Sequence, residues 1–528
     1  MVGTLYLLVQ TQAVVILFGF FVAWHWAALR RRDGRLRLER LGTARTVYCV
    51  GGQKPGLGTS RARGGEVGSD LKSKGERAEL QSKPDAAPRV HVVLPVKRRG
   101  AETERNWRTQ LHTCYSGAVD YLFVVESAAD DAVKGFYRLM KNLAGDGFVI
   151  RVENGTSATA FGKIGTRHSF STPRGAQRTI QMVIVGSSKS NSQKIHSMLC
   201  GVRHASENAK YVLFMDDDIR AHANTIGVSV RSMRMTRGGR PLGKSKSGNS
   251  TPKKTFLANG FPFDLPSKTG TFADYLTMVY HLVLLIAFSH GEFGKNVWGG
   301  CMMLELDSFA KNKHGLVSKY ETGGYSDDLI LAALCDEFGE GVACPCELVF
   351  PQRMSDNQSL KNWWNYLRRQ LFVMDTYVSG RNKRINHGML FVLSYLSFVA
   401  TSGITWSFGK VFVGAFSVVL GGGLEGGTYE GAMEVVTYDP LHLLTLFAFA
   451  SALSAAKAMY KELAVLCFRL GDADVVNDVH EINWVKVGIA FWITYSVVPF
   501  VAITTLVMDD VTWAGIRYRK KKGRVTRL

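Results

Sequence analysis

The apolar residues of this chain are concentrated towards its two ends. Residues 2–29 contain no Asp, Glu, Lys or Arg, and Arg30, Arg31 and Arg32 follow directly. A run of about 20 apolar residues is long enough to cross a bilayer, and a cleaved signal peptide carries its positive charges before its apolar core. The reverse order here predicts an uncleaved transmembrane anchor over residues 1–32, with the chain beyond it in the cytosol.

The C-terminal third repeats the apolar pattern. Residues 388–409 and 487–508 are uncharged runs of spanning length, and residues 411–424 and 441–456 are shorter candidates. A basic tail over residues 511–528 on the same side as a cytosolic domain requires an even number of crossings before it. We therefore predict two to four helices in a transmembrane region over residues 387–510, and favour four with a hairpin at Lys410.

The middle of the chain alternates between strand and helix patterns. Short apolar, β-branched runs occur at residues 90–96, 121–125, 182–185 and 211–215, and residues 192–205 are helical in pattern. Runs of this kind are typical of buried parallel strands. The alternation predicts a doubly wound, Rossmann-like α/β domain over residues 89–386, with ligands bound beyond the carboxyl ends of the strands.

Polar, glycine-rich stretches interrupt these elements. Residues 33–88 contain few bulky apolar side chains and are predicted to be a basic, flexible cytosolic linker. Residues 154–178 and 238–254 are predicted to be mobile insertions in the domain. Asn154 and Asn249 each begin a glycosylation acceptor pattern, which a cytosolic domain leaves unmodified.

Charge and cysteine content exclude two classes of site. The net charge is +21, but the basic residues lie beside apolar segments and in the insertions, without the interleaved aromatics of a base-stacking surface. We expect a membrane partner and no nucleic acid. Of the eight cysteines only Cys344 and Cys346 are closely spaced, so a zinc site is not expected.

The strongest chemical signal is the sequence Asp216-Asp217-Asp218, directly after an apolar strand. Adjacent carboxylates repel one another, and a divalent cation between them offsets that repulsion. Asp216 and Asp218 point the same way in an extended segment and are the predicted metal ligands. Magnesium or manganese here would stabilise a departing diphosphate. A solvated aspartate-rich turn is the alternative.

Asp327 and Asp328 precede a helical run over residues 329–334. A structural role beside a helix cap at Ser326 and a catalytic role are both open from the residues alone. In a catalytic role, one carboxylate would be the general base that deprotonates an acceptor hydroxyl.

Other candidate site residues give weaker evidence when each is considered alone. Glu126 ends a strand and can accept hydrogen bonds from a base or ribose; Lys194 opens a helix and can reach donor phosphates. Gly300 and Cys301 are predicted to line a pocket.

The aromatic and basic segment over residues 362–370 includes Trp364 and Arg368. It is typical of a membrane belt, or of a segment whose cation reaches the diphosphate. A largely apolar run over residues 275–289 is read as a core helix, with an interfacial helix near a lipid entrance as the alternative.

Taken together, these segments resemble the ceramide glucosyltransferases, most of all their plant-type branch. The matching segments are residues 92–97, 106–108, 122–127, 192–196, 211–220, 260–266, 297–303, 323–334 and 364–377. They cover most of residues 90–377, and their order and number, more than any single motif, carry the resemblance.

The resemblance implies an inverting glycosyltransferase of the GT-A fold. Such an enzyme transfers glucose from UDP-glucose to the primary hydroxyl of ceramide, giving glucosylceramide, at the cytosolic face of Golgi or endoplasmic reticulum membranes. Its three acidic positions correspond to Glu126, Asp216 and Asp328, with Asp328 as the general base and Asp327 and Trp364 beside the acceptor. Of the family's (Gln/Arg)-x-x-Arg-Trp motif only Trp364 is kept, which suggests Arg368 as the substitute cation.

Several alternatives remain from the sequence. The donor can be UDP-galactose, and the acceptor a sterol or diacylglycerol. A processive polysaccharide synthase would keep the Gln-x-x-Arg-Trp motif that is missing here, and an inactive lipid-binding or nucleotide-binding protein would have no reason to keep repelling carboxylates. A two-metal nuclease or polymerase would have no use for the membrane spans. The sequence indicates no oligomeric state.

Overall fold

The computed structural model describes residues 2–40, 87–235, 254–289, 293–421 and 440–528, apart from positions 99, 101, 146–150, 154–156, 160–161, 165–166, 172–176 and 357. The α-helices are α1 Val2–Arg40, α2 Thr103–Leu111, α3 Asp131–Gly145, α4 Gln193–Arg203, α5 Thr225–Met233, α6 Phe272–Ala287, α7 Leu306–Ala310, α8 Leu316–Glu321, α9 Asp327–Phe338, α10 Leu360–Phe372, α11 Gly380–Gly421, α13 Pro440–Arg469, α14 Val475–His480 and α15 Trp484–Val507, with short 3₁₀ turns at Lys313–Gly315 and Val373–Asp375. The strands are β1 Arg89–Pro95, β2 Val119–Val125, β3 Arg151–Glu153, β4 Ser157–Thr159, β5 Gly162–Ile164, β6 Arg167–Ser171, β7 Gln177–Ile184, β8 Ala209–Met215, β9 Thr255–Asn259, β10 Phe261–Leu265, β11 Phe293–Gly294, β12 Cys301–Glu305, β13 Gly341–Ala343, β14 Val349–Arg353, β15 Asp510–Trp513, β16 Ile516–Lys521 and β17 Arg524–Arg527.

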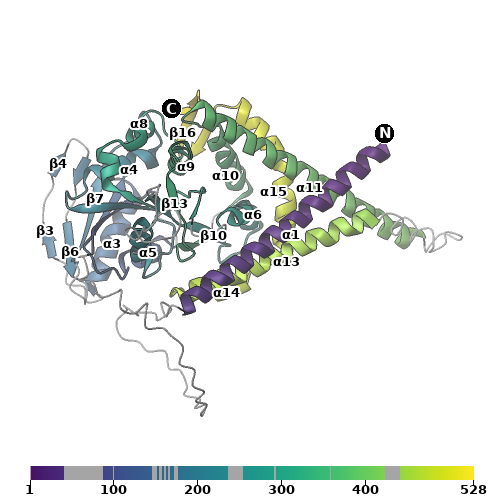
Figure 1. Cartoon of the computed structure of the whole chain (residues 1–528), viewed down its shortest axis with the longest axis horizontal. Coiled ribbons are helices and arrows are strands. Elements are labelled where there is room, and N and C mark those ends of the chain that lie inside the picture. Colours follow the sequence, from purple (N-terminus) through teal and green to yellow (C-terminus); the bar gives the residue numbers. More distant parts are fainter. Residues whose placement is uncertain are drawn as a thin grey trace, which may run out of the picture.

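A mixed α/β domain with a parallel central sheet is present, as predicted, and lies to one side of the long apolar helices (Figure 1). Strands β8, β1, β2 and β7 are parallel neighbours, and they correspond to the four strands expected from the sequence. Their residues are almost all buried, which explains why each reads as a continuous apolar run. Antiparallel β12 follows β8 on one side, and β9 and β13 continue the sheet beyond it.

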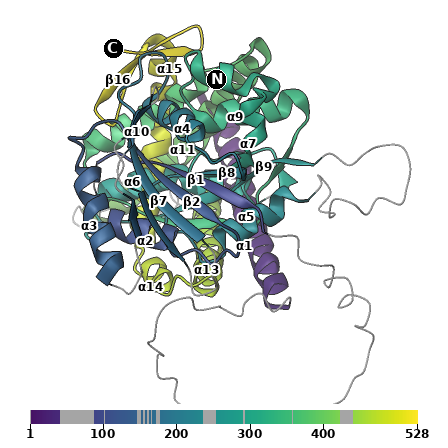
Figure 2. The same cartoon turned by 90° about the vertical axis from the view of Figure 1, so that its left-hand side faces the viewer.

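Helices cover both faces of this sheet. One face packs on α2, α3 and α5 through side chains such as Trp107, Phe136 and Ile226. The other packs on α4, α8 and α9 through side chains such as Met198, Tyr320 and Leu331. The sheet is seen edge-on between these layers in Figure 2. This is the layered arrangement expected of a doubly wound domain.

The insertions are only partly described. The described parts of residues 154–178 form short strands β4, β5 and β6, which extend the sheet beside β7 and so replace part of the expected loop. Most of the expected linker, at residues 41–86, and most of the second insertion, at residues 236–253, lie outside the described residues. The acceptor patterns that begin at Asn154 and Asn249 lie there as well.

Four helices of the described chain, namely α1, α11, α13 and α15, are long and apolar enough to cross a membrane. The predicted hairpin at Lys410 is wrong, because α11 continues as a helix through that residue to Gly421. Lysine is itself a good helix former, so a single lysine does not end a helix. Between the α/β domain and the C-terminal strands there are thus three long apolar helices in the described residues, where the sequence favoured four.

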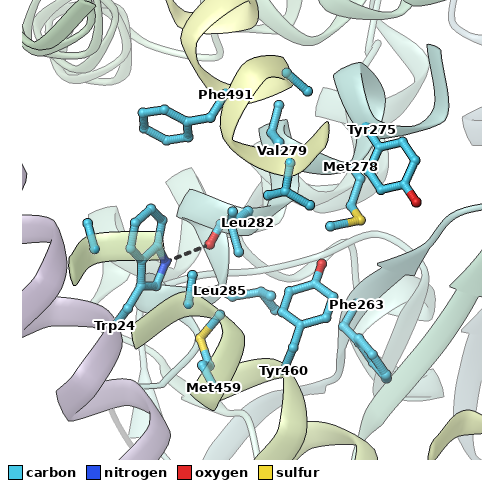
Figure 3. Close-up of a cluster of buried hydrophobic side chains, with 14 of the residues drawn as sticks. Trp24, Phe263, Tyr275, Met278, Val279, Leu282, Leu285, Met459, Tyr460 and Phe491 are labelled. Atoms are coloured by element: carbon cyan, nitrogen blue, oxygen red, sulfur yellow. Dashed lines mark hydrogen bonds between the residues drawn. The ribbon is translucent and has the colours of Figure 1, made fainter. Parts of the chain in front are cut away.

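The first and last thirds of the chain meet in one apolar cluster. Helices α1 and α13 lie side by side (Figure 1). Figure 3 shows Trp24 of α1 donating to the carbonyl oxygen of Leu282 in α6, at 3.1 Å, with Tyr460 of α13 and Phe491 of α15 nearby. Helix α6 is therefore a core helix that joins the α/β domain to the apolar helices, as the default prediction had it.

Helix α15 contacts the α/β domain at its start and in its middle, and strand β16 at its end. At its start, the amide of Asn483 donates to the Tyr275 hydroxyl at 3.2 Å. In its middle, the hydroxyl of Tyr495 donates to the carbonyl oxygen of Val279 at 3.3 Å. At its end, the carbonyl oxygen of Thr505 accepts a hydrogen bond from Lys520.

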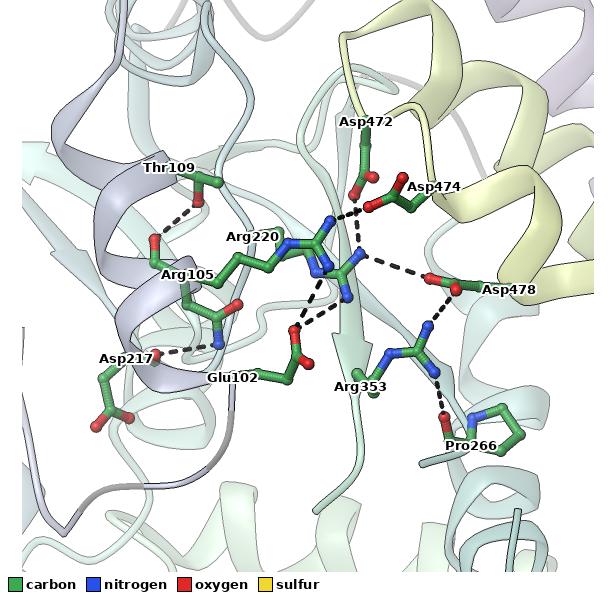
Figure 4. Close-up of polar contacts among 11 residues, drawn as sticks. Glu102, Arg105, Thr109, Asp217, Arg220, Pro266, Arg353, Asp472, Asp474 and Asp478 are labelled. Atoms are coloured by element: carbon green, nitrogen blue, oxygen red, sulfur yellow. Dashed lines mark hydrogen bonds and ion pairs between the residues drawn. The ribbon is translucent and has the colours of Figure 1, made fainter. Parts of the chain in front are cut away.

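A buried ion-pair network ties the connection between α13 and α15 to the α/β domain (Figure 4). The Arg220 guanidinium, which is 3% exposed, lies 3.4 Å from Glu102, 3.4 Å from Asp472 and 3.6 Å from Asp478. Arg353 pairs with Asp478 and donates to the carbonyl oxygen of Pro266. Removal of one partner from such a network leaves an uncompensated buried charge, so the network fixes the position of α14.

The segment expected to be a basic tail forms a small antiparallel sheet instead. Strands β15, β16 and β17 pair in sequence order and constitute what we call the C-terminal sheet. Along β16, Ile516, Tyr518 and Lys520 point inwards while Arg517 and Arg519 point to solvent. Buried and exposed residues alternate one by one, as expected for a half-buried strand. The high content of basic residues concealed this pattern in the sequence.

Candidate functional site

A cavity of about 1100 Å³ opens at the carboxyl ends of the parallel strands and extends along α6, α9 and α11. Its polar end is lined by Lys97, Lys194, Asp216, Asp217, Asp218, Gly299, Gly300, Asp327 and Asp328. Its apolar end is lined by residues such as Leu284, Leu285, Phe288, Ile385 and Met389. A single cavity therefore joins a charged centre to an apolar wall.

The backbone of the triple aspartate is held in place from two sides. The side-chain amide of Gln110 in α2 donates to the carbonyl oxygens of Asp216 and Ile219, at 2.8 and 3.1 Å. The Asp216 amide donates to the carbonyl oxygen of Gly300, at 2.9 Å, which continues the ladder between β8 and β12. Gln110 is fully buried, so the loop has little freedom to move.

Lys194 lies at the centre of the carboxylates. Its ammonium group lies 2.8 Å from Asp216 and 3.2 Å from Asp327, and it also donates to the Gly299 carbonyl oxygen at 3.1 Å. Ser192 caps the start of α4 by accepting from the Ile195 amide, which fixes the helix that carries Lys194. Burial lowers the pKa of Lys194, but the two carboxylates outweigh burial and raise it, so the side chain is charged.

Asp217, Asp218 and Asp327 carry raised pKa values. Burial and the carboxylates of Asp218 and Asp216 raise the pKa of Asp217 well above its usual value. Burial and the neighbouring Asp216 raise the pKa of Asp218 to about 6. Burial also raises the pKa of Asp327 to about 7, although Lys194 opposes the shift. Such shifts are common at functional sites, where carboxylates are crowded before a substrate or cation arrives.

Asp328 stands at the start of α9 and lines the cavity. The Ser326 hydroxyl and the Leu329 amide both donate to its Oδ1 atom. Ser326 thus bonds to Asp328 and does not cap the helix through its side chain. Among the described residues no hydrogen bond is made to Oδ2, which leaves that oxygen for a ligand in the cavity.

Glycines 299 and 300 permit the close packing of the charged centre. A Cβ atom at Gly299 would lie 2.8 Å from a carboxylate oxygen of Asp327 and 3.0 Å from the Lys194 nitrogen. One at Gly300 would lie 2.1 Å from the ring of Trp298. Both glycines line the cavity, whereas the predicted pocket residue Cys301 lies fully buried in the core of the sheet.

Three other predicted residues lie away from the cavity wall. Glu126 follows β2 and lies 2.8 Å from Lys97, and Lys97 lines the cavity in its place. Trp364 is partly exposed on α10. Arg368 donates to the carbonyl oxygen of Asp510 in the C-terminal sheet, at 3.1 Å. The neighbouring Arg369 faces the cavity, because one residue along a helix turns the side chain by about 100°.

A second polar group lies in the cavity, and no motif in the sequence indicated it. The His281 ring lies 2.7 Å from the Asp264 carboxylate and 3.2 Å from the Tyr366 hydroxyl, and all three residues line the cavity. Burial lowers the pKa of His281, but Asp264 outweighs burial and raises it. These residues come from β10, α6 and α10, so only the fold brings them together.

The carboxylates offer the type of ligand that a divalent cation prefers, but fewer ligands than a complete metal site needs. Asp216 and Asp218 supply the oxygen ligands that magnesium and manganese prefer. In the described part of the chain, no group of three or more histidine, cysteine, aspartate or glutamate side chains has the geometry of a metal site. A cation here would be held by these two carboxylates and completed by oxygens of a bound diphosphate, as is common for magnesium.

Comparisons with known proteins find only distant similarities. No protein-family model matches the sequence, and no curated protein matches it. Among solved structures, a mannosyltransferase from Pyrobaculum calidifontis in complex with GDP-Man and Mn²⁺ is 12% identical, with a TM-score of 0.35, over 85% of this chain and 97% of that one. Glucosyl-3-phosphoglycerate synthase from Mycobacterium tuberculosis, with Mn²⁺, UDP and product, is 13% identical, with a TM-score of 0.27, over 57% and 85%. TarS 1–349 from S. aureus is 9% identical, with a TM-score of 0.25, over 83% and 98%. At these TM-scores the likenesses assign no activity to this chain.

Proposed function

We propose that this protein is an inverting, membrane-bound glycosyltransferase of the GT-A type that transfers glucose from UDP-glucose to the primary hydroxyl of ceramide. The observation that supports it is the single cavity that joins a crowded acidic centre to an apolar wall. A sugar nucleotide with a metal ion suits the first part, and a lipid chain suits the second. A water-soluble acceptor would have no use for the apolar wall.

In this proposal the acidic centre binds the donor. Asp216 and Asp218 hold magnesium or manganese, which neutralises charge on the departing diphosphate. Lys194 lies beside Asp216, so it can turn towards a phosphate once the cation occupies the carboxylates. Arg369, which lines the same cavity, is a second cation for the diphosphate and takes the role that the sequence suggested for Arg368.

Asp328 is the proposed general base. Its free Oδ2 atom accepts the proton of the acceptor hydroxyl, and the resulting oxygen nucleophile attacks the anomeric carbon from the face opposite the diphosphate. The bond between that carbon and the diphosphate oxygen breaks, and UDP leaves with the electron pair. One displacement inverts the configuration, so the product is a β-glucoside.

The apolar wall is the proposed path of the acceptor chains. Leu284 and Leu285 on α6 and Ile385 and Met389 on α11 all line the cavity. Phe391 and Val392 continue this surface along α11 and are largely exposed. A ceramide could thus keep its chains in the bilayer beside α11 while its hydroxyl reaches Asp328.

We further propose that α1, α11 and α13 cross the membrane and that α15 does not. The start and the middle of α15 contact the α/β domain, and its end contacts β16 of the C-terminal sheet, which itself packs on that domain. Two crossings, by α11 and α13, return the chain to the side of the α/β domain, where the C-terminal sheet packs. The α/β domain faces the cytosol, on a Golgi or endoplasmic reticulum membrane.

A donor and acceptor panel tests the function. Purified full-length protein is given UDP-glucose or UDP-galactose, Mg²⁺ or Mn²⁺, and ceramide, a sterol or diacylglycerol, and the lipids are analysed by mass spectrometry. We expect β-glucosylceramide from UDP-glucose and ceramide. If only a sterol or diacylglycerol is glycosylated, the proposed glycosyltransferase activity stands and ceramide is rejected as the acceptor. No glycolipid from any pair would reject the proposal.

A further inference from the structure

The C-terminal sheet packs against the loop that carries the proposed base. The amide of Val525 donates to the carbonyl oxygen of Gly323, at 2.9 Å. Tyr325, three residues before Asp328, is buried among Phe372, Trp513 and Tyr518, with ring centroids 5.3 to 5.7 Å apart. Trp513 also lines the cavity. The sheet is therefore part of the wall of the site.

The same sheet reaches the donor side of the cavity. Arg527 donates from Nη1 to Oε1 of Glu126, at 2.8 Å, and to the side chain of Gln193 at 3.4 Å. Lys97 holds the other oxygen of Glu126, at 2.8 Å. The hydroxyl of Tyr518 accepts a hydrogen bond from the Gln193 amide, one residue before Lys194. Glu126 thus has one cation on each oxygen, and one of the two comes from the C-terminal sheet.

Resting on the function proposed above, we propose that Arg527 is a positioning residue for the nucleoside half of the donor. It fixes the Glu126 carboxylate beyond the end of β2, beside Lys97, which lines the cavity, and the base and ribose of a nucleoside diphosphate would lie next to this pair. The C-terminal sheet is thereby a wall of the nucleotide site, contributed by residues far from the α/β domain in sequence.

The charges agree with this role. Burial raises the pKa of Glu126, but its hydrogen bonds to Lys97 and Arg527 outweigh burial and lower the pKa, so the carboxylate accepts hydrogen bonds from the hydroxyl or N–H groups of a nucleoside. The pair is only partly buried, with side-chain exposures of 28% for Arg527 and 15% for Glu126. A pair this accessible contributes little to folding stability. The position of the pair beside Lys97, which lines the cavity, then matters more than its contribution to stability.

Nucleotide binding and steady-state kinetics on the full-length protein test the proposal. Arg527→Ala should weaken UDP binding, measured by titration calorimetry, and raise the KM for UDP-glucose by about tenfold, which corresponds to about 1.4 kcal/mol. The kcat and the KM for ceramide should stay within about twofold. Arg527→Lys should restore most of the affinity, because it keeps the charge.

Two further variants separate this role from general damage. Lys521→Ala removes a charge from the outward face of the same sheet and should leave UDP binding unchanged. Glu126→Gln should weaken UDP binding as Arg527→Ala does, and the double variant should bind no more weakly than Glu126→Gln alone. If Arg527→Ala folds poorly, Arg527→Gln, which removes the charge and keeps much of the side-chain length, replaces it in this comparison.

The outcomes distinguish the two proposals. If the unaltered protein binds UDP and Arg527→Ala binds it equally well, the role of Arg527 is refuted while the glycosyltransferase proposal stands. Additive effects of the Glu126 and Arg527 variants would also refute it. If the unaltered protein binds neither UDP nor UDP-glucose in the presence of Mn²⁺, the proposed function fails, and the role of Arg527 fails with it.

Discussion

The ammonium group of Lys194 lies 2.8 Å from the carboxylate of Asp216. A proposed metal ligand is thus already paired with a positive charge that the protein itself supplies. Asp327 shares the same lysine, at 3.2 Å, so Lys194 offsets the repulsion between two carboxylates that come from different elements. Lys194 and a divalent cation are alternative ways to neutralise this centre, and the first prediction follows from that competition.

Lys194→Met should destabilise the protein and make it more dependent on metal. Loss of one partner from a buried charge cluster typically costs about 3 kcal/mol or more. The midpoint of thermal unfolding should fall, and millimolar Mn²⁺ should raise it more in the variant than in the unaltered protein. Lys134→Met is the control, because Lys134 is 83% exposed in its pair with Asp131. Equal stabilisation of all three proteins by Mn²⁺ would contradict the prediction.

Metal binding should depend on pH in a defined direction. The pKa of Asp218 is raised to about 6 by burial and by Asp216, so its carboxyl group is protonated below that pH and ionised above it. Because a cation requires the ionised form, Mn²⁺ affinity should be full near pH 8 and fall as the pH drops through about 6. Electron paramagnetic resonance of free Mn²⁺ would measure this. Asp218→Asn should bind Mn²⁺ weakly at every pH; a steep fall near pH 6 in that variant would refute the assignment.

Asp328→Asn should remove turnover and spare donor binding. General-base catalysis typically contributes about 10²- to 10⁴-fold, so kcat should fall by that order. UDP affinity should stay within about twofold, because Asp328 is placed at the acceptor side. Asp327→Asn is the matched comparison. The Asp327 carboxylate is paired with Lys194, so its loss should raise the KM for the donor more than it lowers kcat. If Asp327→Asn loses turnover and Asp328→Asn keeps it, the base is Asp327.

The two flanks of α15 should be accessible from the same side of the membrane. Glu481→Cys lies just before the helix and Lys521→Cys in the C-terminal sheet after it, and both positions are exposed. In sealed vesicles, a membrane-impermeant maleimide should label both variants from the side of the α/β domain, above the labelling of the unaltered protein. Labelling of the two positions from opposite sides would show that α15 crosses.

The sequence predicted those parts of the molecule in which local pattern and burial agree. Strands β1, β2, β7 and β8 are buried on both faces, so their apolar runs identify them, and Ser192 marks the start of α4. The triple aspartate is recognisable because it directly follows such a strand. Lys194 lies beside Asp216 in the structure, and its role near the donor phosphates stays a prediction.

Other features depend on contacts that a sequence does not display. His281, Asp264 and Tyr366 come together from three elements, and none stands in a motif. The choice between Arg368 and Arg369 requires the rotation of α10, which is set by its packing on α15 and α6. The C-terminal sheet was missed because its outward basic residues give the segment the composition of a solvated tail, although its period of two was present.

The pairing of α1 with α13 has a consequence for biosynthesis. Arg35 lies 3.2 Å from Glu462, a residue 427 positions later in the chain. At a synthesis rate of about 5–20 residues per second, the ribosome needs roughly 20 seconds or more to reach that partner. In the proposed membrane arrangement, α1 stands in the bilayer during this time without its main neighbour, so its own apolar surface must hold it there. The absence of Asp, Glu, Lys and Arg from residues 2–29 meets that requirement, and the bundle closes only as the last third of the chain is made.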